Sequence, residues 1–452
     1  MTSATLTRWY PLRPHAEQRR LWDSPCRFRV VPAGRRSGKS ELSKRYGVSR
    51  AIGPQLWSDA RYVFTAPTHQ QARRIFWNDV KRMIPKWALA GQNPRTAIRE
   101  SDLSIRLHNG AEILVSGLDV PERIEGVAVD WICIDEIGNC HAEVWGEHIR
   151  PMLSERNGQA WLIGVPEGRN HYWLMSQKAQ EDASGLWSFH TWTSATVLPP
   201  EEIEIARAEL DLRTFRQEYE ASFLDATGRV YYGFRRELHA AERLAYDPTL
   251  PLVLCFDFNV APGVCVICQE QQYKGSNPAV ASTFTAVINE IWIPSDSNTQ
   301  RVCREIIERY GNHASDVIAY GDATGGAKGT AKVDGSDWDI VEKMLRPVFG
   351  QPRTRPGRGD FECRVPNSNP RERVRINAAN SRLQSADGKV HLLIDPRCVH
   401  TIQDFEGVTY RQGTSEIDKK SSPMLTHLTD ALGYYVNYEF PTTEHPFEVV
   451  QF

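Results

Sequence analysis

Near its N-terminus the chain reads Ala33-Gly34-Arg35-Arg36-Ser37-Gly38-Lys39-Ser40, between a short apolar run and a segment with helical character. A strand, a glycine-bearing turn that ends in Gly-Lys-Ser, and a helix are the parts of a phosphate-binding loop. Consecutive backbone N–H groups in such a loop, with the helix N-terminus behind them, form a nest for polyphosphate. The stretch therefore predicts a nucleotide site built from residues 34–40. In it, Lys39 would reach the β- and γ-phosphates and the Ser40 hydroxyl would hold Mg²⁺.

A second stretch, Trp131-Ile132-Cys133-Ile134-Asp135-Glu136, is an apolar strand that ends in two carboxylates. Asp135 would bind the metal, and Glu136 would polarise the water that attacks the nucleotide. Each stretch alone also fits a glycine-rich turn or an unrelated acidic pair at a strand end. Both together, in this order, indicate an NTPase. Upstream, Gln18 is a candidate contact to adenine, and ordinary packing of a surface helix is the alternative.

The composition of the chain limits its class and its possible partners. The chain has 452 residues with 41% hydrophobic and 24% charged residues, which is typical of a globular protein with two or three domains. The formal net charge is −2, so any nucleic-acid surface must be a local patch. There is no apolar run of the length of a transmembrane helix, and we expect no membrane contact. Nine cysteines without framework spacing indicate a reducing compartment.

Alternating helical and strand-like runs predict that the first half is a mostly parallel sheet covered by helices, with its ligand at the carboxyl ends of the strands. Pro199-Pro200 opens two charged helices, and the pattern weakens after them. The expected division is an ATPase domain at 1–195, a helical lid or linker at 196–226, a hinge at 227–246, a second α/β domain at 247–440 and a tail at 441–452.

The second half carries another acidic constellation. Leu252 to Asp257 and Val317 to Asp322 are apolar strands that each end in an acid, and Asp430 lies in a helical segment near the C-terminus. This layout is typical of an RNase H-like nuclease, in which three carboxylates lie close together. Two Mg²⁺ or Mn²⁺ ions offset the repulsion between their negative charges. Each acid alone also fits a turn at a strand end, above all Asp322.

Other side chains near these acids are candidates with open alternatives. His427 would share a helix face with Asp430 and assist the site, or it is structural. An arginine-rich stretch before the third acid would grip phosphate backbone irrespective of sequence, or it is a solvated helix face; its candidates are Arg353, Arg355, Arg358, Arg371 and Arg375. Cys265 and Cys268 form a C-x-x-C, but strand alternation would place them on opposite faces, which disfavours a metal site.

With both constellations in view, the chain resembles the large subunit of tailed-bacteriophage terminases. The resemblance rests on the two stretches above and on Ala66-Pro67-Thr68, Gly164-Val165-Pro166, Phe215-Arg216-Gln217-Glu218-Tyr219 and Thr426-His427-Leu428-Thr429-Asp430-Ala431. It implies an ASCE-type P-loop ATPase followed by an RNase H-like nuclease. Such a protein uses ATP to move double-stranded DNA into a procapsid and cuts concatemeric DNA. Its implied partners are a portal protein, a small terminase subunit and further copies in a ring, expected to be a pentamer, in the host cytoplasm and transiently at the portal vertex.

Two departures from the family pattern bear on individual residues. Val165 stands where the family's coupling motif usually has a hydroxyl residue, which puts its role as a γ-phosphate sensor in doubt. Glu125 stands where many relatives carry a trans-acting arginine before a glycine, here Gly126. We expect Arg123 to act in trans, and Arg35 or Arg36 to sense phosphate within the loop. The competing interpretations are a helicase or translocase whose second domain binds DNA without cutting it, and a structural adaptor that holds a nucleotide.

Overall fold

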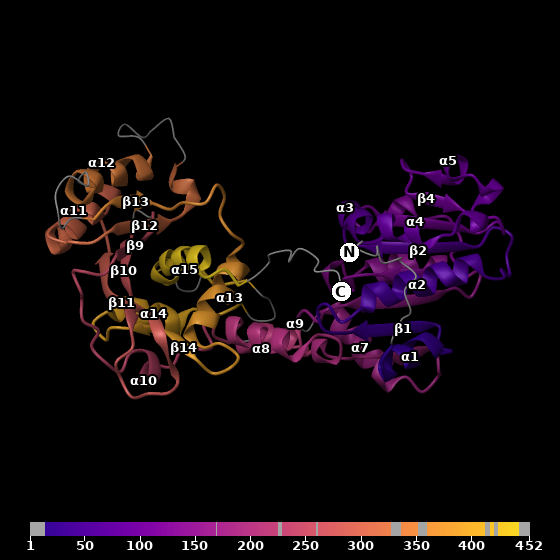
Figure 1. Ribbon diagram of the computed structural model, residues 1–452, viewed down its shortest axis with the longest axis horizontal. Coiled ribbons are helices and arrows are strands. Elements are labelled where there is room, and N and C mark those ends of the chain that lie inside the picture. The colour runs from indigo at the N-terminus through magenta and orange to yellow at the C-terminus, as the bar shows by residue number, and fades with distance from the viewer. Residues whose placement is uncertain are drawn as a thin grey trace, which may run out of the picture. The chain divides into compact units, whose positions relative to one another are not determined.

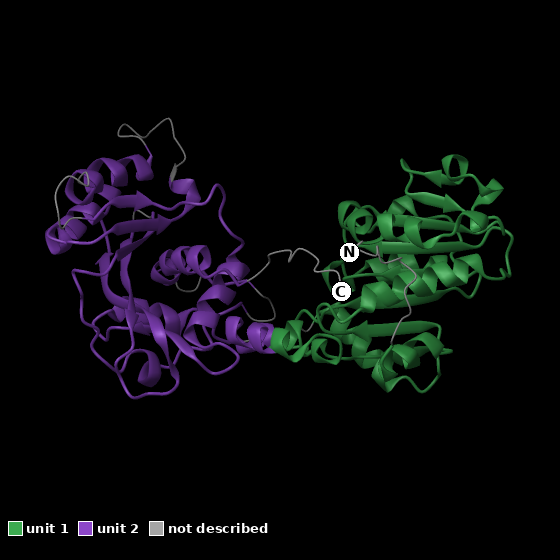
Figure 2. Cartoon of the chain, viewed as in Figure 1, with its two compact units in different colours: residues 1–203, 216–225 green, residues 204–215, 226–452 purple. Residues whose placement is uncertain are grey.

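The computed structural model describes residues 14–168, 170–224, 228–258, 261–326, 336–350, 359–411, 416–419 and 424–442. The chain forms two compact units (Figure 2). Unit 1 comprises residues 1–203 and 216–225, and unit 2 comprises residues 204–215 and 226–452. The chain therefore passes between the units three times, twice within the helices α8 (Pro200–Glu209) and α9 (Leu212–Glu218).

Unit 1 is built on an eight-stranded sheet with the order β3-β4-β5-β2-β6-β7-β1-β8. Figure 1 labels β4, β2 and β1 of this sheet. The six strands from β5 to β8 in this order run parallel, and β3 and β4 add an antiparallel edge. The strands are β1 (Phe28–Pro32), β2 (Arg61–Ala66), β3 (Ile98–Arg99), β4 (Ser104–Arg106), β5 (Glu112–Gly117), β6 (Trp131–Ile134), β7 (Gln159–Gly164) and β8 (Trp187–Phe189). The predicted mostly parallel sheet is confirmed.

Helices cover both faces of this sheet, so its strands are buried on both sides and read as near-continuous apolar runs. One core contains Val31, Phe64 and Leu42, and the other contains Val30, Ile132 and Tyr172. The helices are α1 (Ala16–Asp23), α2 (Lys39–Ile52), α3 (His69–Ala72), α4 (Asn78–Met83), α5 (Pro94–Ala97), α6 (Arg150–Met152) and α7 (His171–Glu181). A π-helical turn, η1 (Arg73–Trp77), joins α3 to α4.

Unit 2 is built on a six-stranded sheet with the order β13-β12-β9-β10-β11-β14. The antiparallel strands β9, β10 and β11 form its centre, and β12, β13 and β14 add to it in parallel. The strands are β9 (Leu252–Asp257), β10 (Gly263–Gln272), β11 (Val280–Ile293), β12 (Val317–Gly321), β13 (Phe361–Cys363) and β14 (Val390–Ile394).

Alternation along these strands sends side chains into two cores. Cys255 packs with α13, α14 and α15 on one face, and Leu254 packs with α11 and α12 on the other. Cys268 and Cys265 divide between the same two cores, as strand alternation predicts, so the C-x-x-C does not converge on one point. The helices are α10 (Arg236–His239), α11 (Thr299–Tyr310), α12 (Asp337–Phe349), α13 (Glu372–Leu383), α14 (Val399–Gly407) and α15 (His427–Glu439).

Helix α13 begins at Glu372 with Arg371 as its N-cap residue, so Pro370 precedes the helix. None of the helices formed by the described residues has the length and apolar character needed to cross a membrane.

Candidate functional site

The phosphate-binding stretch connects β1 to α2 and has the backbone that a tight loop requires. Gly38, immediately before α2, has φ +84°, a left-handed conformation that favours glycine. Gly34 is needed for space: a Cβ there would lie 2.4 Å from Ser194 Oγ and 2.7 Å from the carbonyl oxygen of Tyr219. The loop is thus shaped by glycine at both ends, and α2 presents its N-terminus behind it.

The cation and hydroxyl of the loop lie beside the first acid of the second stretch. In the sheet, β7 separates β1 from β6, and all three strands run in the same direction, so their carboxyl ends share one edge. Ser40 Oγ donates a 2.6 Å hydrogen bond to Asp135 Oδ2. Lys39 is buried, and its Nζ donates to the carbonyl oxygen of Gly34 at 3.2 Å. Burial raises the pKa of Asp135, although Ser40 and Lys39 act against that rise.

Glu136 follows in a strained backbone conformation, with φ +52°. The backbone N–H of Val165 donates to its Oε2 at 3.4 Å. Burial raises the pKa of Glu136 to about 7, with Lys39 lowering it and Asp135 raising it. A carboxyl group with a pKa near neutrality is suited to accept a proton from water, because the charged form and the driving force for transfer are then balanced.

Gln18 belongs to α1 and contacts the phosphate loop. Its Nε2 donates to the carbonyl oxygen of Ser37 at 3.2 Å, and Trp192 Nε1 donates to the same oxygen at 3.0 Å. Gln18 is buried, so its position is fixed by the loop's backbone. Its contact to adenine stays a prediction.

Three arginines were expected to meet phosphate. Arg35 donates from Nε to Glu218 Oε2 at 2.6 Å, and Arg36 is exposed with φ +58°. Arg123 ends the short helix η4 (Pro121–Arg123) and is exposed, as a residue that acts on a neighbouring copy must be. Glu125 is hydrogen-bonded to His148.

In unit 2 the three predicted acids lie in one neighbourhood. Gly321 of β12 pairs with Phe256 of β9, so Asp322 and Asp257 are the next residues on adjacent strands, which lie about 4.8 Å apart. The helix that carries Asp430, α15, packs against both strands. Burial raises the pKa of the Tyr434 phenol on this helix, and the negative charges of all three aspartates raise it further. One side chain thus lies in the field of all three carboxylates.

Each of these carboxylates has a different set of partners. Asp257 Oδ2 lies 3.1 Å from His427 Nδ1, so the histidine contacts the first acid. Asp322 accepts from Asn369 Nδ2 at 2.6 Å and from Thr324 Oγ1 at 2.7 Å.

Asp430 is surrounded by two cations. It accepts from Arg375 Nη1 at 3.1 Å and from Lys419 Nζ at 3.3 Å. Lys419 Nζ also contacts Glu372 Oε1 at 2.9 Å.

No group of three or more His, Cys, Asp or Glu side chains within the described ranges is arranged to hold a metal ion. The donor types nevertheless fit Mg²⁺ or Mn²⁺, which prefer carboxylate oxygens. Arg375 and Lys419 both contact Asp430, so positive charge offsets that carboxylate.

The predicted DNA-binding arginines have separate outcomes. Arg353, Arg355 and Arg358 lie outside the described residues. Arg371 is exposed. Arg375 is only 8% exposed and is bonded to Asp430, so its guanidinium neutralises a carboxylate inside the fold instead of lying on a surface open to DNA.

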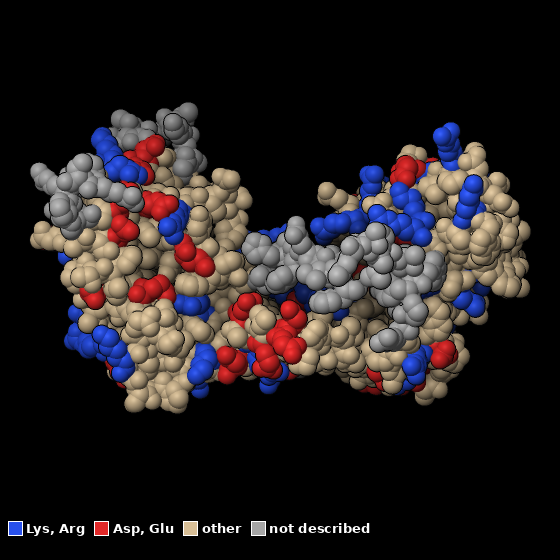
Figure 3. Space-filling model, in the orientation of Figure 1, with Lys and Arg blue, Asp and Glu red and all other residues tan. Residues whose placement is uncertain are grey.

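Unit 1 has a local basic surface, although the formal net charge of the whole chain is −2. Lys and Arg side chains gather over the face that carries α3 and α4 (Figure 3). Arg73 and Arg74 are exposed on η1 between these helices.

Sequence reasoning missed the residues that support the acids. Asn369 and Lys419 approach from segments that no motif marked. Buried Asp404 accepts from the backbone N–H groups of Leu428 and Thr429 at 2.9 and 3.2 Å, which caps the first turn of α15. The sequence signal for Asp404 was an acid between the apolar residues Ile402 and Phe405 of one helix.

Asp404 gives a prediction for stability against pH. Burial raises its folded-state pKa from 3.8 to about 7. Between these values the folded protein binds a proton that the unfolded chain lacks, so this contribution to stability is complete below about pH 4 and is lost as pH rises through 7. The slope is at most about 1.4 kcal/mol per pH unit. We expect Asp404→Asn, which keeps an acceptor for the cap, to flatten the decline in unfolding free energy between pH 5 and 8 in urea titrations.

Glu406 supplies the matched control for this measurement. It lies on the same helix, and its hydrogen bond with Arg236 lowers its pKa, so Glu406→Gln should leave the decline between pH 5 and 8 in place. An unchanged decline in Asp404→Asn would contradict the assignment.

Comparison with known proteins places these sites in a family context. Residues 31–238 match the family model described as "Terminase large subunit, T4likevirus-type, N-terminal". The large terminase subunit of Thermus phage G20c is 28% identical over 254 residues, which cover 49% of this chain and 51% of that protein. The subunit of Escherichia phage T5 is 26% identical over 226 residues, with 49% and 50% covered. The chain thus aligns with about half the length of these curated relatives.

The fold likeness extends further than the sequence likeness. The crystal structure of the large terminase from a thermophilic bacteriophage aligns with 94% of this chain and 98% of its own, with a TM-score of 0.55 and 13% identity. The same phage protein in complex with ATP-γ-S aligns with a TM-score of 0.53 and 13% identity over 93% of this chain. The predicted order of a P-loop ATPase fold and an RNase H-like fold is therefore confirmed.

Proposed function

Because this chain resembles terminase large subunits in sequence over its first half and in fold along nearly its whole length, we propose that it is a viral DNA-packaging motor. It would hydrolyse ATP to move double-stranded DNA into a procapsid, and it would cut concatemeric DNA with a second, metal-dependent site. The observation that carries the proposal is the pairing of Ser40 with Asp135 beside half-buried Glu136. The other unit of the same chain places Asp257 and Asp322 at adjacent strand ends and Asp430 on a helix that packs against both strands.

In the ATPase site, each residue has a role that its position supports. The backbone of residues 34–38 would cradle the phosphates, and Lys39 would leave the Gly34 carbonyl oxygen for the β- and γ-phosphates. Ser40 and Asp135, 2.6 Å apart, offer two oxygen ligands to Mg²⁺, which would neutralise charge on the phosphates. Glu136 would orient the attacking water and accept its proton at Oε1 or Oε2.

In the nuclease site, Asp257, Asp322 and Asp430 would hold two Mg²⁺ or Mn²⁺ ions, which would supply charge stabilisation to the scissile phosphodiester. Asn369 and Thr324 would orient the Asp322 carboxylate, and His427 would orient that of Asp257. Arg375 and Lys419 would balance the charge of Asp430 when ions are absent.

The motor assignment also implies an organisation and a set of partners. Residues 1–195 would act as the ATPase domain, 196–226 as a lid or linker, 227–246 as a hinge, 247–440 as the nuclease and 441–452 as a tail. Copies of the chain would form a ring, expected to be a pentamer, on a portal protein, with a small terminase subunit presenting the DNA. The protein would act in the host cytoplasm and transiently at the portal vertex. DNA contacts would come from Arg353, Arg355, Arg358 and Arg371, and from the exposed Arg73 and Arg74.

The test measures two activities of the purified chain. We expect ATP hydrolysis that needs Mg²⁺ and is stimulated by double-stranded DNA, and nicking of supercoiled plasmid that needs Mg²⁺ or Mn²⁺. ATP hydrolysis without nicking under any metal would favour the alternative function, a DNA helicase or translocase whose second domain binds but does not cut. Absence of ATP hydrolysis would overturn the motor proposal.

Arg123 is proposed as the arginine that completes a neighbouring copy's site. An arginine that stabilises transition-state charge in trans contributes about 10³- to 10⁵-fold in kcat in well-studied NTPases. We expect Arg123→Ala to reduce DNA-stimulated ATP hydrolysis at least about 10²-fold while ADP affinity stays unchanged, as measured by steady-state kinetics and calorimetry. Arg95→Ala, at another exposed arginine of unit 1, is the control. Full stimulated activity in Arg123→Ala would remove the assignment.

A further inference from the structure

A segment far along the chain is bonded to the first turn of the phosphate loop. The backbone N–H of Arg35 donates to the carbonyl oxygen of Glu218 at 2.6 Å, and Ser194 links both sides by donating from Oγ to the Arg35 oxygen at 2.7 Å and from N to the Tyr219 oxygen at 2.7 Å. The space at Gly34 is filled by the same two partners, Ser194 and Tyr219. The loop's shape in unit 1 therefore depends on residues 218 and 219.

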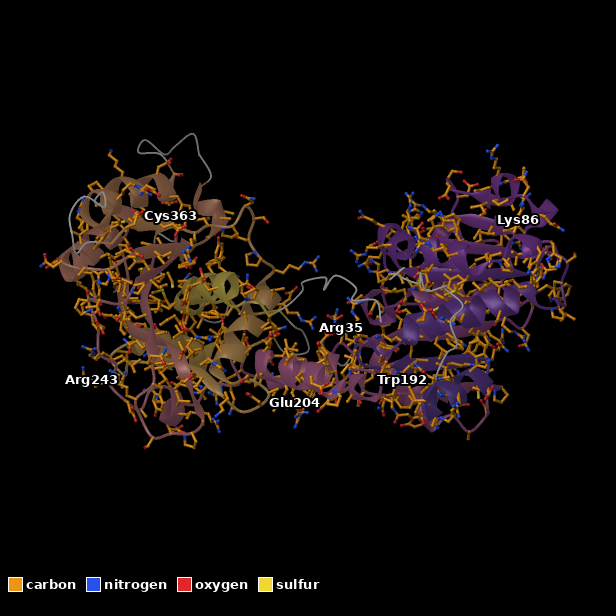
Figure 4. All side chains as sticks on the ribbon, in the orientation of Figure 1. Arg35, Lys86, Trp192, Glu204, Arg243 and Cys363 are labelled. Carbon is orange, nitrogen blue, oxygen red and sulfur yellow. The ribbon has the colours of Figure 1, made fainter. Side chains whose placement is uncertain are left out.

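The side chains of Arg35 and Glu218 are also bonded to each other. Arg35 Nε donates to Glu218 Oε2 at 2.6 Å, and this is the one hydrogen bond that the Arg35 side chain makes among the described residues. The Glu218 side chain is 16% exposed, whereas that of Arg35 is 57% exposed. The carboxylate is thus the more enclosed partner, and more than half of the Arg35 side chain is open to solvent. Figure 4 labels Arg35 at this position.

The guanidinium also lies within the field of the catalytic acid. Burial alone would lower the Arg35 pKa, but Glu218 and, more weakly, Glu136 raise it. The backbone links the loop to this acid: Ala33 N donates to the Gly164 oxygen at 3.1 Å, and the N–H of the next residue, Val165, donates to Glu136 Oε2 at 3.4 Å. Glu136 is the group proposed to orient the attacking water, so Arg35 belongs to a loop that lies beside the reacting phosphate. A guanidinium held through Nε presents its remaining N–H groups in a fixed fork, which matches a phosphate.

We propose that Glu218 is a positioning residue for ATP hydrolysis, which holds Arg35 so that its Nη groups meet the terminal phosphate beside Glu136. The inference rests on the proposed ATPase function and adds to it a residue outside both nucleotide motifs. Glu218 acts through Arg35 and does not itself touch the nucleotide. Because the Arg35 side chain is already held by Glu218, its guanidinium can stabilise the transition state without a further loss of conformational entropy.

The first test compares Glu218→Gln and Glu218→Ala with wild type. Both substitutions keep the backbone carbonyl that accepts from Arg35 N, so the loop retains that bond. We expect kcat for ATP hydrolysis to fall about ten- to a hundred-fold, with Glu218→Ala affected more. Affinity for a non-hydrolysable ATP analogue should fall, whereas ADP affinity should stay unchanged, because only the terminal phosphate meets Arg35. The control is Glu220→Gln, at an exposed acid that lies 3.9 Å from Arg216.

The second test asks whether Glu218 acts through Arg35. In an Arg35→Ala background, Glu218→Ala should produce no further loss in kcat, because the group that it positions is absent. Equal losses in both backgrounds, a parallel loss of ADP affinity, or an unchanged kcat in Glu218→Ala would each overturn the inference. Thermal unfolding of each variant identifies a loss of kcat that comes from misfolding. If Glu218→Ala does not fold, Glu218→Gln takes its place in the comparison of kcat between the two backgrounds. A wild-type chain without ATP hydrolysis would instead overturn the proposed function.

Discussion

Glu136→Gln is expected to lower the rate of ATP hydrolysis by about 10²- to 10⁴-fold, the range that general-base catalysis contributes. The amide keeps the size of the side chain and can still accept from the Val165 N–H, so the local fold should persist. It cannot take a proton from water. Because burial raises the pKa of Glu136 to about 7, the wild-type carboxyl is suited to that task near neutral pH.

The same variant tests whether the two chemistries are separate. Glu136 belongs to unit 1 and the three aspartates belong to unit 2, so metal-dependent nicking of plasmid by Glu136→Gln should equal that of wild type. ATP affinity should change little, because Lys39 and the loop backbone remain. Glu143→Gln, at an exposed acid shortly after the strand, controls for the loss of a charge. Wild-type ATP hydrolysis in Glu136→Gln would mean that another group activates the water.

The strength of local signals explains how much of unit 1 was predictable. A loop bounded by glycines, a lysine and a hydroxyl residue between a strand and a helix is a continuous pattern, and the structure gives Gly38 the left-handed backbone that the pattern implies. The 2.6 Å contact between Ser40 and Asp135 joins residues 95 positions apart, yet it follows once both strands are recognised as parallel and close in the sheet.

The contacts that support the sites were not predictable, because no periodicity records them. Glu218 contacts Arg35 across 183 positions in the sequence. Its backbone carbonyl and its side chain each accept a 2.6 Å hydrogen bond from Arg35. Arg375 shows the reverse case. In sequence it is one of several arginines in a basic stretch, and only the packing of α13 against α15 turns it inward to Asp430. A residue type shows which bond a side chain can make, and the tertiary fold selects the partner.

The order of strands explains the partial success in unit 2. Apolar strands that end in acids were recognised, and the parallel pairing of β9 with β12 sets Asp257 beside Asp322. Among the described residues no group of three or more acids is arranged to hold a metal ion, so the assembly of the three acids around metal ions stays a prediction. Asp322 accepts hydrogen bonds from Asn369 and Thr324, and Asp430 accepts one from Lys419, and none of these partners was marked by a motif.

Asp257→Asn is expected to reduce metal-dependent nicking of supercoiled plasmid by roughly 10²-fold or more. The substitution removes a charged oxygen ligand from the centre of the proposed cluster, and metal ions contribute several kcal/mol of charge stabilisation in such reactions. His427 can still donate to the amide oxygen, so the fold of α15 should be preserved. Calorimetric titration with Mn²⁺ in the absence of DNA should show weaker binding, which reports on the site independently of cleavage.

The opposite pattern of losses completes the argument for two sites. Asp257→Asn should hydrolyse ATP at the wild-type rate, whereas Glu136→Gln should not, and each should keep the activity that the other loses. Glu308→Gln, at an exposed acid on α11 across the sheet, controls for a change of charge in unit 2. If Asp257→Asn nicked plasmid as wild type does, the carboxylates at the ends of β9 and β12 would be strand-end acids and the second unit would serve only to bind DNA. If it lost both activities while remaining folded, the two chemistries would share a site, and the proposal of two independent sites would fail.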